Sequence, residues 1–267
     1  MRHGLAPPIA CGCGVFSMNI GRFEIFPSYL DNVRVNPVFG TIVNALAIIV
    51  GSLVGLMLMG SMQEKYNRTV MQAMGLVVIL IGIRSALKTN ALLVVILSLA
   101  IGSVIGEWLG IEKRLDRLGL WLEQRFSKSG SSFSKGFVTA SLLFCVGAMA
   151  IVGSLESGLS NHHQTLLAKS VIDGISAMVF ASTLGLGVLF SAVSVFAYQG
   201  LLTVSASYVQ PFLLPQVVDQ MAAVGGLLIV GIGIGLLEIR KIHVGNMLPA
   251  IFLPLVYMAI KQLVAVF

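Results

Sequence analysis

The chain has 267 residues, of which 57% are hydrophobic and only 10% are charged, and its formal net charge is +6. Soluble domains carry about 25% charged residues, so this composition excludes a water-soluble protein and favours lipid as the surrounding solvent. The positive charge does not indicate nucleic-acid binding, because that needs a basic patch on a solvent-exposed surface. We expect the lipid bilayer as a partner and no nucleic acid.

Residues 1–36 combine prolines, glycines and arginines without an apolar run long enough to cross a bilayer. We predict a poorly structured N-terminal segment here, followed by a single membrane domain over residues 37–267. Cys11 and Cys13 lack neighbouring ligands, and a closed tetrahedral metal site needs four donors. We therefore expect no metal and no cofactor.

Long runs without Asp, Glu, Lys or Arg mark the membrane spans. They cover residues 35–63, 136–155 and 174–218, and about 20 apolar residues suffice to cross the hydrocarbon layer. The longest run must hold two helices, and we expect their junction within Phe190–Ser194. The sequence thus predicts an all-α, polytopic transmembrane helix bundle of eight spans, or seven if that junction is absent, near residues 41–60, 69–87, 90–111, 137–154, 168–189, 191–209, 217–236 and 246–265.

The loop between the third and fourth spans decides the orientation. Six of the 17 basic residues lie in segment 112–136, and cytoplasmic loops carry the excess of Lys and Arg. This loop should face the cytoplasm, which places both termini outside. Leu115, Leu118, Leu122 and Phe126 recur there at helical spacing, so residues 112–128 are predicted to form an amphipathic helix at the membrane surface.

Two apolar spans contain similar segments. Residues 75–83 (GLVVILIGI) resemble residues 226–234 (GLLIVGIGI), and the two spans run in opposite directions in the predicted topology. Many secondary transporters are built from such inverted repeats. The similarity rests on residues that are common in every span, so a repeat and a chance match both stay open.

The predicted fourth span ends in a segment rich in glycine and serine that contains Ser154 and Glu156. We predict unwound backbone from Gly153 onwards, and irregular backbone at membrane depth survives only where protein or a water-filled cavity satisfies it. Broken helices of this kind hold ions and substrates in transporters. The alternative is an ordinary loop outside the membrane with a solvated Glu156.

Asp173 lies inside the fifth predicted span, with Ser176 nearby and Lys169 one helical turn before it. A carboxylate at the centre of a membrane helix costs about 3 kcal/mol on insertion scales, so it indicates function. A Lys169–Asp173 ion pair at the interface is the structural alternative. We take Asp173 and Ser176 as candidates for binding a substrate or an ion.

Three further polar residues lie near span ends. Asn44 and Asn246 offer amide donors and an acceptor, and Pro249 after Asn246 predicts a kinked helix that frees a carbonyl oxygen. Glu107 lies at the cytoplasmic end of the third span, where an interfacial position is the plainer interpretation. All three are candidate substrate or ion ligands.

The sequence has neither a phosphate-binding Gly-x-x-x-x-Gly-Lys-Ser/Thr loop nor a Gly-x-Ser-x-Gly nucleophile elbow. We therefore expect neither ATP-driven transport nor an enzyme, and we identify no catalytic residue.

Five short motifs together resemble a known family. They are Gly40-Thr-Ile-Val-Asn44-Ala, Ile105-Gly-Glu107, Lys169-Ser-Val-Ile-Asp173-Gly, Ala223-Val-Gly-Gly-Leu and Asn246-Met-Leu-Pro249-Ala. The combination is similar to the YqgA-like family of bacterial inner-membrane proteins, over about residues 38–265. The resemblance implies a bacterial inner-membrane location and a transport role, without a substrate. It carries Asn44, Glu107, Asp173 and Asn246 over as motif positions only.

The leading hypothesis is a secondary transporter or ion-coupled permease of a small solute or ion. Asp173 and Glu156 would bind the coupling cation or protons, and Asn44, Asn246 and Ser154 would line the site. Two alternatives stay open. One is a passive channel, which needs a ring of like residues and a homo-oligomer to form the pore. The other is a membrane scaffold or regulator that acts through the basic 112–136 loop.

Overall fold

The structure is a computed structural model, and it describes residues 36–59, 64–126 and 132–266. The described residues form helices and their connections, with no strand among them, which confirms the predicted all-α fold. The elements in chain order are α1 (Phe39–Met59), α2 (Glu64–Ala86), α3 (Leu92–Leu109), α4 (Ile111–Phe126), α5 (Ser132–Val146), α6 (Ala148–Ser160), α7 (Gln164–Leu184), α8 (Gly187–Val209), the 3-10 turn η2 (Gln210–Phe212), α9 (Pro215–Leu236), the 3-10 helix η3 (Val244–Phe252) and α10 (Leu253–Val266). The predicted N-terminal segment lies almost entirely outside the described residues.

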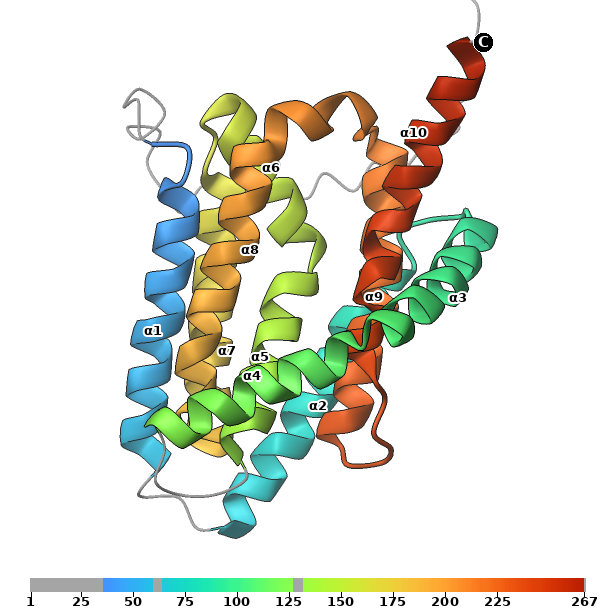
Figure 1. Cartoon of the computed structure of the whole chain (residues 1–267). Coiled ribbons are helices and arrows are strands. Elements are labelled where there is room, and N and C mark those ends of the chain that lie inside the picture. The colour runs from blue at the N-terminus through green and yellow to red at the C-terminus, as the bar shows by residue number, and fades with distance from the viewer. Residues whose placement is uncertain (1–35, 60–63, 127–131, 267) are drawn as a thin grey trace, which may run out of the picture. The chain divides into compact units, whose positions relative to one another are not determined.

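Seven segments are long and apolar enough to cross a membrane, and the eighth candidate is the pair α5 and α6, bent by 59°. A Cβ atom added at Gly187, where α8 begins, would overlap Phe133 of α5, whereas one at Gly158 of α6 would overlap Thr203 near the end of α8. The bent pair therefore runs along the whole length of α8 and makes one broken crossing. With eight crossings, α1 begins and α10 ends at the same end of the bundle (Figure 1).

Two predicted boundaries are wrong. The backbone does not unwind at Gly153 and Ser154, which lie inside α6; the break is at Gly147, between α5 and α6. The α7–α8 junction is not at Phe190–Ser194, which lies within α8. It is at Gly185, whose φ of 78° is a conformation that glycine adopts without a steric cost and that no residue of the predicted junction would favour.

The helices pack as two groups. Helix group A consists of α1, α5, α6, α7 and α8, and helix group B consists of α2, α3, α9, η3 and α10. Glycines allow the close contacts within each group. A Cβ at Gly51 of α1 would overlap the carbonyl oxygen of Gly174 in α7, and a Cβ at Gly106 of α3 would overlap that of Asn246 in η3. Backbones approach this closely at small residues because van der Waals packing drives helix association in lipid.

The two similar segments of α2 and α9 lie against each other. A Cβ at Gly82 would lie 2.6 Å from the Gly226 oxygen, and a Cβ at Gly233 would lie 2.9 Å from the Gly75 oxygen. The pairing of 75 with 233 and 82 with 226 shows that α2 and α9 run antiparallel, as the predicted topology requires. Whether they descend from a duplication stays a prediction.

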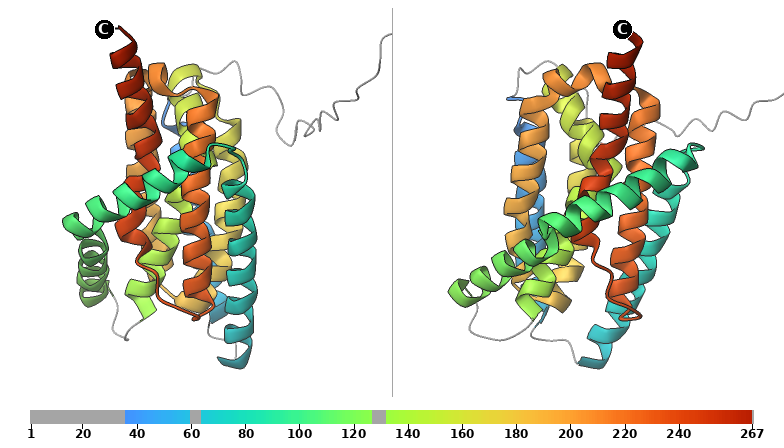
Figure 2. Two further views of the ribbon diagram at one scale, coloured as in Figure 1. Left: turned by 90° about the vertical axis from the view of Figure 1, so that its right-hand side faces the viewer. Right: turned by 45° about the vertical axis from the view of Figure 1, so that its right-hand side comes forward.

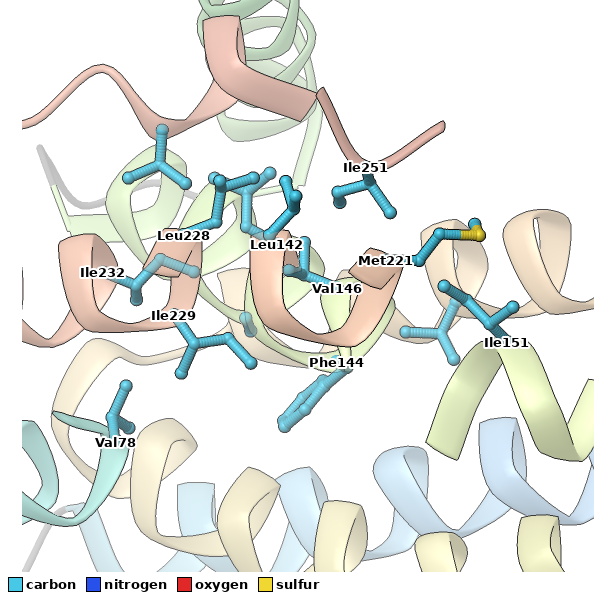
Figure 3. Close-up of a cluster of buried hydrophobic side chains, with 14 of the residues drawn as sticks. Val78, Leu142, Phe144, Val146, Ile151, Met221, Leu228, Ile229, Ile232 and Ile251 are labelled. Carbon is cyan, nitrogen blue, oxygen red and sulfur yellow. The ribbon is translucent and has the colours of Figure 1, made fainter. Parts of the chain in front are cut away.

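Helix α9 lies at the centre of the apolar core. In its spanning window 67% of the residues are buried, against 17% in α2 and 22% in α3, whose remaining surface is available to lipid. Figure 3 shows Leu228, Ile229 and Ile232 of α9 surrounded by apolar side chains from α2, α5, α6 and η3, among them Val78, Leu142, Val146, Ile151 and Ile251. This shared core joins the two helix groups.

The predicted amphipathic helix is α4, which covers residues 112–126 of the predicted segment; residues 127 and 128 lie outside the described part. It follows α3 after Gly110, whose φ is 60°. Leu118 and Trp121 stay exposed, and α4 packs on α5 and η3. Figure 2 shows that α3 lies obliquely to α2 and α9, and that α4 continues towards the ends of helix group A.

Candidate functional site

An ion pair lies inside α7. Lys169 and Asp173 are one turn apart, their side chains are only 6% and 8% exposed, and the Lys169 Nζ donates to Asp173 Oδ2. Because α7 begins at Gln164 instead of near 168 as predicted, Asp173 lies about 14 Å along the helix at 1.5 Å per residue, close to the middle of the span. The predicted ion pair is thus formed, but it lies near the middle of the span with both side chains buried, and not at the interface.

Two amides complete this cluster. Asn44 of α1 donates from Nδ2 to Asp173 Oδ2 at 3.0 Å and to Gln199 Oε1 of α8 at 3.2 Å. Both amide residues are fully buried. The contact of Gly51 with Gly174 brings α1 close enough to α7 for the short Asn44 side chain to reach the carboxylate. We call Asn44, Lys169, Asp173 and Gln199 the central polar cluster.

Two polar atoms of the central polar cluster have no partner. Asn44 Oδ1 and Gln199 Nε2 are buried and make no hydrogen bond with any described residue. An unpaired buried polar group costs about 1–3 kcal/mol, so two of them in one cluster carry a free-energy cost that a bound polar partner would remove. One atom is an acceptor and the other a donor, which together can bind a polar ligand.

The break between α5 and α6 lies beside this cluster. The Lys169 Nζ is 6.0 Å from the centroid of the Phe144 ring, and α5 ends two residues later at Val146. The last turn of a helix has carbonyl groups without intrahelical partners, which carry partial negative charge. A broken span therefore adds cation-binding potential next to a carboxylate and an ammonium group.

A second polar cluster joins α3, α4 and η3. Asn246 Nδ2 donates to Glu107 Oε2 at 2.5 Å, and Asn246 Oδ1 accepts from the Glu112 backbone N–H at 2.7 Å. The Glu112 carboxylate in turn accepts from the Gly245 N–H at 3.1 Å. Burial raises the pKa of Glu112, while His243, Lys241 and the Gly245 N–H act to lower it. This arrangement fixes the kinked entrance to the last span.

A cavity of about 560 Å³ adjoins the second cluster. Its wall is formed by α5 of helix group A on one side and by α9 and the following turn of helix group B on the other, with α4 at its edge. The lining residues are Glu112, Asp116, Ser134, Lys135, Val138, Thr139, Leu142, Gly231, Ile232, Gly235, Leu236, Glu238, Arg240, Lys241, Ile242 and Val244. By the Lys and Arg distribution this is the end expected to face the cytoplasm.

A third set of contacts lies at the C-terminal end of α6, away from the break at Gly147. Glu156 accepts from the Thr165 hydroxyl at 2.6 Å, and Ser157 Oγ lies 2.5 Å from His163 Nδ1. Burial, followed by the charge of His162, lowers the pKa of His163. These contacts connect α6 to α7 and place Glu156 in a half-buried position with a partner.

The structure thus divides the candidate residues among separate places. Asn44 and Asp173 meet in the central polar cluster, Asn246 meets Glu107 in the second cluster, and Glu156 meets Thr165. Ser154 is buried with its hydroxyl unpaired, and Ser176 makes no side-chain hydrogen bond; both statements refer to the described residues. The four motif positions of the family resemblance therefore form two pairs, one in each cluster.

Sequence reasoning did not single out Gln199 or Glu112. Gln199 had a usable signal, because an amide in the middle of a run without charged residues is as unusual as Asn44. Glu112 had none, since a carboxylate at the start of an amphipathic helix is ordinary. Among the described residues no group of three or more His, Cys, Asp or Glu side chains could hold a metal ion.

Comparison with known proteins gives three matches. Residues 39–259 match the family described as "Protein of unknown function (DUF554)". The chain is 33% identical to the "Uncharacterized membrane protein YdfK" of Bacillus subtilis, over 81% of this chain and 93% of the relative. It is 30% identical to the "Uncharacterized protein YqgA" of Escherichia coli, over 81% and 94%. No solved structure matches.

Proposed function

The chain belongs to the DUF554 family, and on that premise we propose that this multi-pass membrane protein is an ion-coupled secondary transporter of a small solute. The proposal includes the cytoplasmic membrane of a bacterium as its location. Two relatives of bacterial origin and the helical spans support that location.

The central polar cluster is the observation that carries the proposal. Ionisable residues inside the membrane are costly, and those that persist line substrate paths or proton relays by default. Beside this ion pair, an amide acceptor and an amide donor have no hydrogen-bond partner among the residues that the structure describes, so a polar ligand could bind there. The adjoining broken span is the feature that transporters use to bind ions at mid-membrane.

The ion pair suggests how binding of an ion and a solute would be linked. A cation or a proton that reaches Asp173 competes with Lys169 for the carboxylate. Once Asp173 is neutralised, the Lys169 ammonium needs another anionic partner in a medium where an unpaired charge is unfavourable. Exchange of partners would thus couple occupancy by the driving ion to binding of the solute.

The two helix groups could move relative to each other during transport. Alternating access needs two bodies that tilt around a central site. Helix groups A and B meet where α9 contacts α5 and α6 and where α2 contacts α7. The central polar cluster belongs to group A, and the 560 Å³ cavity opens between the groups at one end. Such a cavity is expected in a transporter that is open to one side.

Transport by proteoliposomes tests the proposal. Vesicles loaded with a pH-sensitive dye would be exposed to imposed proton, sodium and potassium gradients with a panel of amino acids, organic acids and amines. We expect gradient-dependent uptake by the native protein and its loss, at least tenfold, in Asp173→Asn. Asp219→Asn is the matched control, because Asp219 is exposed at the start of α9 and makes no ion pair with any described residue.

Equal flux in the native protein and in Asp173→Asn would refute the assignment of Asp173. Saturable uptake distinguishes a transporter from the channel alternative, which would instead show unitary conductance steps in planar bilayers. Absence of flux with every gradient and solute of the panel would count against transport and favour the scaffold alternative.

A further inference from the structure

The cavity between the helix groups has an apolar floor. Leu142, Ile232, Leu236 and Val244 are buried beneath it, while Lys135, Glu238, Arg240 and Lys241 at its rim are exposed. At about 560 Å³ it lies in the range of 300–1,000 Å³ that is typical of small-molecule sites. An apolar body therefore fits the floor, and a polar or charged group fits the rim.

Gly235 keeps part of this cavity free. No atom lies within 4 Å of the position that a Cβ would occupy at Gly235, although the residue is in the last turns of α9. Glycine costs about 1 kcal/mol relative to alanine inside a helix, and no helix contact requires it here. Its effect is to leave room beside the floor residues.

The charged side chains at the rim favour a ligand with a negative charge. Glu238 is paired with Lys135 at 3.1 Å, and Lys241 lies 3.8 Å from Glu112 and 4.0 Å from Asp116. A cationic ligand would have to displace one of these lysines. Arg240 lines the same cavity and makes no ion pair with any residue that the structure describes. An anion can therefore bind its guanidinium group without breaking an existing pair, in the bidentate geometry that carboxylates prefer.

From these observations we propose that the cavity binds a small organic anion with an apolar body, its carboxylate on Arg240 and its body on the floor beside Gly235. This inference rests on the proposed function and adds the class of its solute: the cavity is where the solute binds from the expected cytoplasmic side. It also agrees with the anionic partner that Lys169 would need after Asp173 is neutralised.

The test compares three probes that share one body and differ in charge: phenylacetate, phenylacetamide and phenethylammonium. Thermal unfolding of the purified full-length protein in neutral phosphatidylcholine nanodiscs would be recorded against the concentration of each. A ligand that binds only the folded state raises the unfolding midpoint by mass action. We expect a concentration-dependent rise with phenylacetate and little or none with the other two.

Two variants with matched controls locate the site. Arg240→Gln should reduce the apparent affinity for phenylacetate at least tenfold, whereas Arg114→Gln, another exposed arginine without an ion pair among the described residues, should not. Gly235→Trp should fill the cavity and abolish the shift. Gly200→Trp is its control, because Gly200 is a helical glycine of α8 that also has open space at the Cβ position.

Equal shifts with all three probes, or a shift that survives Gly235→Trp, would overturn the inference. An anionic lipid has the same combination of a charged group and an apolar body. If the phenylacetate shift disappears in phosphatidylglycerol nanodiscs, the cavity binds lipid, and the proposal of a solute site is refuted. Flux separates this inference from the proposed function. If phenylacetate binds but is not taken up, the binding site is supported and the transport function is contradicted. If phenylacetate is taken up and Gly235→Trp does not change the uptake, transport is supported and the binding site is contradicted.

Discussion

Burying the Lys169–Asp173 pair costs a large free energy relative to what the pair contributes to folding. Removing two charges from water costs several kcal/mol for each ion, and mutual attraction and hydrogen bonds only partly offset this. Asn44 provides one hydrogen bond to the carboxylate, and Phe144 presents its ring to the ammonium group at 6.0 Å. A pair of apolar residues would hold α7 in place at lower cost, so the pair itself indicates a role beyond packing.

The first prediction concerns the stability of this pair. Lys169→Gln should destabilise the protein by about 3–5 kcal/mol, because it leaves Asp173 buried without a counter-charge. The double variant Lys169→Gln/Asp173→Asn should be more stable than Lys169→Gln, since both charges are then absent. Denaturant unfolding in mixed micelles would measure the coupling. Strictly additive effects would show that the two side chains do not depend on each other.

The second prediction concerns pH and His163. Burial and the neighbouring His162 lower the pKa of His163, so the folded protein binds the proton less well than the unfolded chain does. The contribution of this residue is therefore fully present above the ordinary histidine pKa of about 6.5 and is lost as the pH falls from there through the lower folded pKa. The other groups in contact with the ring are Ser157 and Phe39.

Unfolding midpoints between pH 7.5 and 5 would check this second prediction. The native protein should lose more stability over this range than His163→Gln does. His243→Gln serves as the control, since His243 is exposed. A loss of the same size in His163→Gln and in the native protein would refute the prediction.

Among the elements, the broken span is the one least explained by packing. Gly147 separates α5 from α6 with φ of −71° and ψ of 145°, a conformation open to any residue, and no atom lies within 4 Å of the position of a Cβ. Neither the backbone nor a neighbouring helix requires glycine there. The remaining property of glycine is its freedom to change conformation, which a moving hinge would use.

The third prediction follows from that freedom. Gly147→Ala should raise the stability by about 0.4–1 kcal/mol, because alanine restricts the unfolded chain and fits the folded conformation. We expect the same substitution to lower the rate of solute uptake several-fold by restricting the hinge. Gly200→Ala in α8 is the control and should leave uptake unchanged. Unchanged uptake in Gly147→Ala would show that the break is a fixed feature of the fold.

The spans were predictable from the sequence, but their interruptions were not. Runs of about 20 apolar residues without charge predict helices, because a segment of that length in lipid must satisfy its backbone polar groups within itself. This signal can be read from composition alone. The break was expected at Gly153 and Ser154, since small and polar residues gather there. These residues instead pack inside α6, where a Cβ at Gly153 would lie 3.0 Å from the Leu166 side chain. Composition cannot distinguish a glycine for close packing from a glycine for bending.

The candidate site was predictable only in part, for a related reason. Asp173 and Asn44 are visible in the sequence as polar residues within apolar spans. Their pairing with each other and with Gln199 depends on which helices are neighbours, and this is decided by contacts such as that of Gly51 with Gly174. In the sequence, Asn246 and Glu107 are equally good candidates for the same site, but helix packing places them together in the second cluster.

At the scale of the whole protein, the described helices make an even number of crossings. This conclusion depends on the bent pair α5 and α6 passing from one end of α8 to the other. The Lys and Arg distribution then adds a direction, with α4 and the turn before η3 at the cytoplasmic end. The connections after α6 and after α8 belong to the opposite end.

The fourth prediction tests that arrangement. In a chain whose three native cysteines are replaced, Lys65→Cys and Arg240→Cys should react with a membrane-impermeant maleimide only from the cytoplasmic side. Asn161→Cys and Gln210→Cys should react only from the other side. Labelling of intact cells and of inverted vesicles would distinguish the two. Reaction of Lys65→Cys and Asn161→Cys from one side, with Arg240→Cys reacting from the other, would mean that α5 and α6 form a re-entrant loop.

The neutrality of the Lys169–Asp173 pair has a consequence for how the membrane potential acts on this protein. Moving one elementary charge across 100 mV is worth about 2.3 kcal/mol, but a paired ammonium and carboxylate that move together carry no net charge. In the proposed transporter, the voltage would therefore do no work on this pair when no ligand is bound. It would act only on the step that carries the solute and its ion, and an anion with one negative charge that is accompanied by one proton would cross independently of voltage.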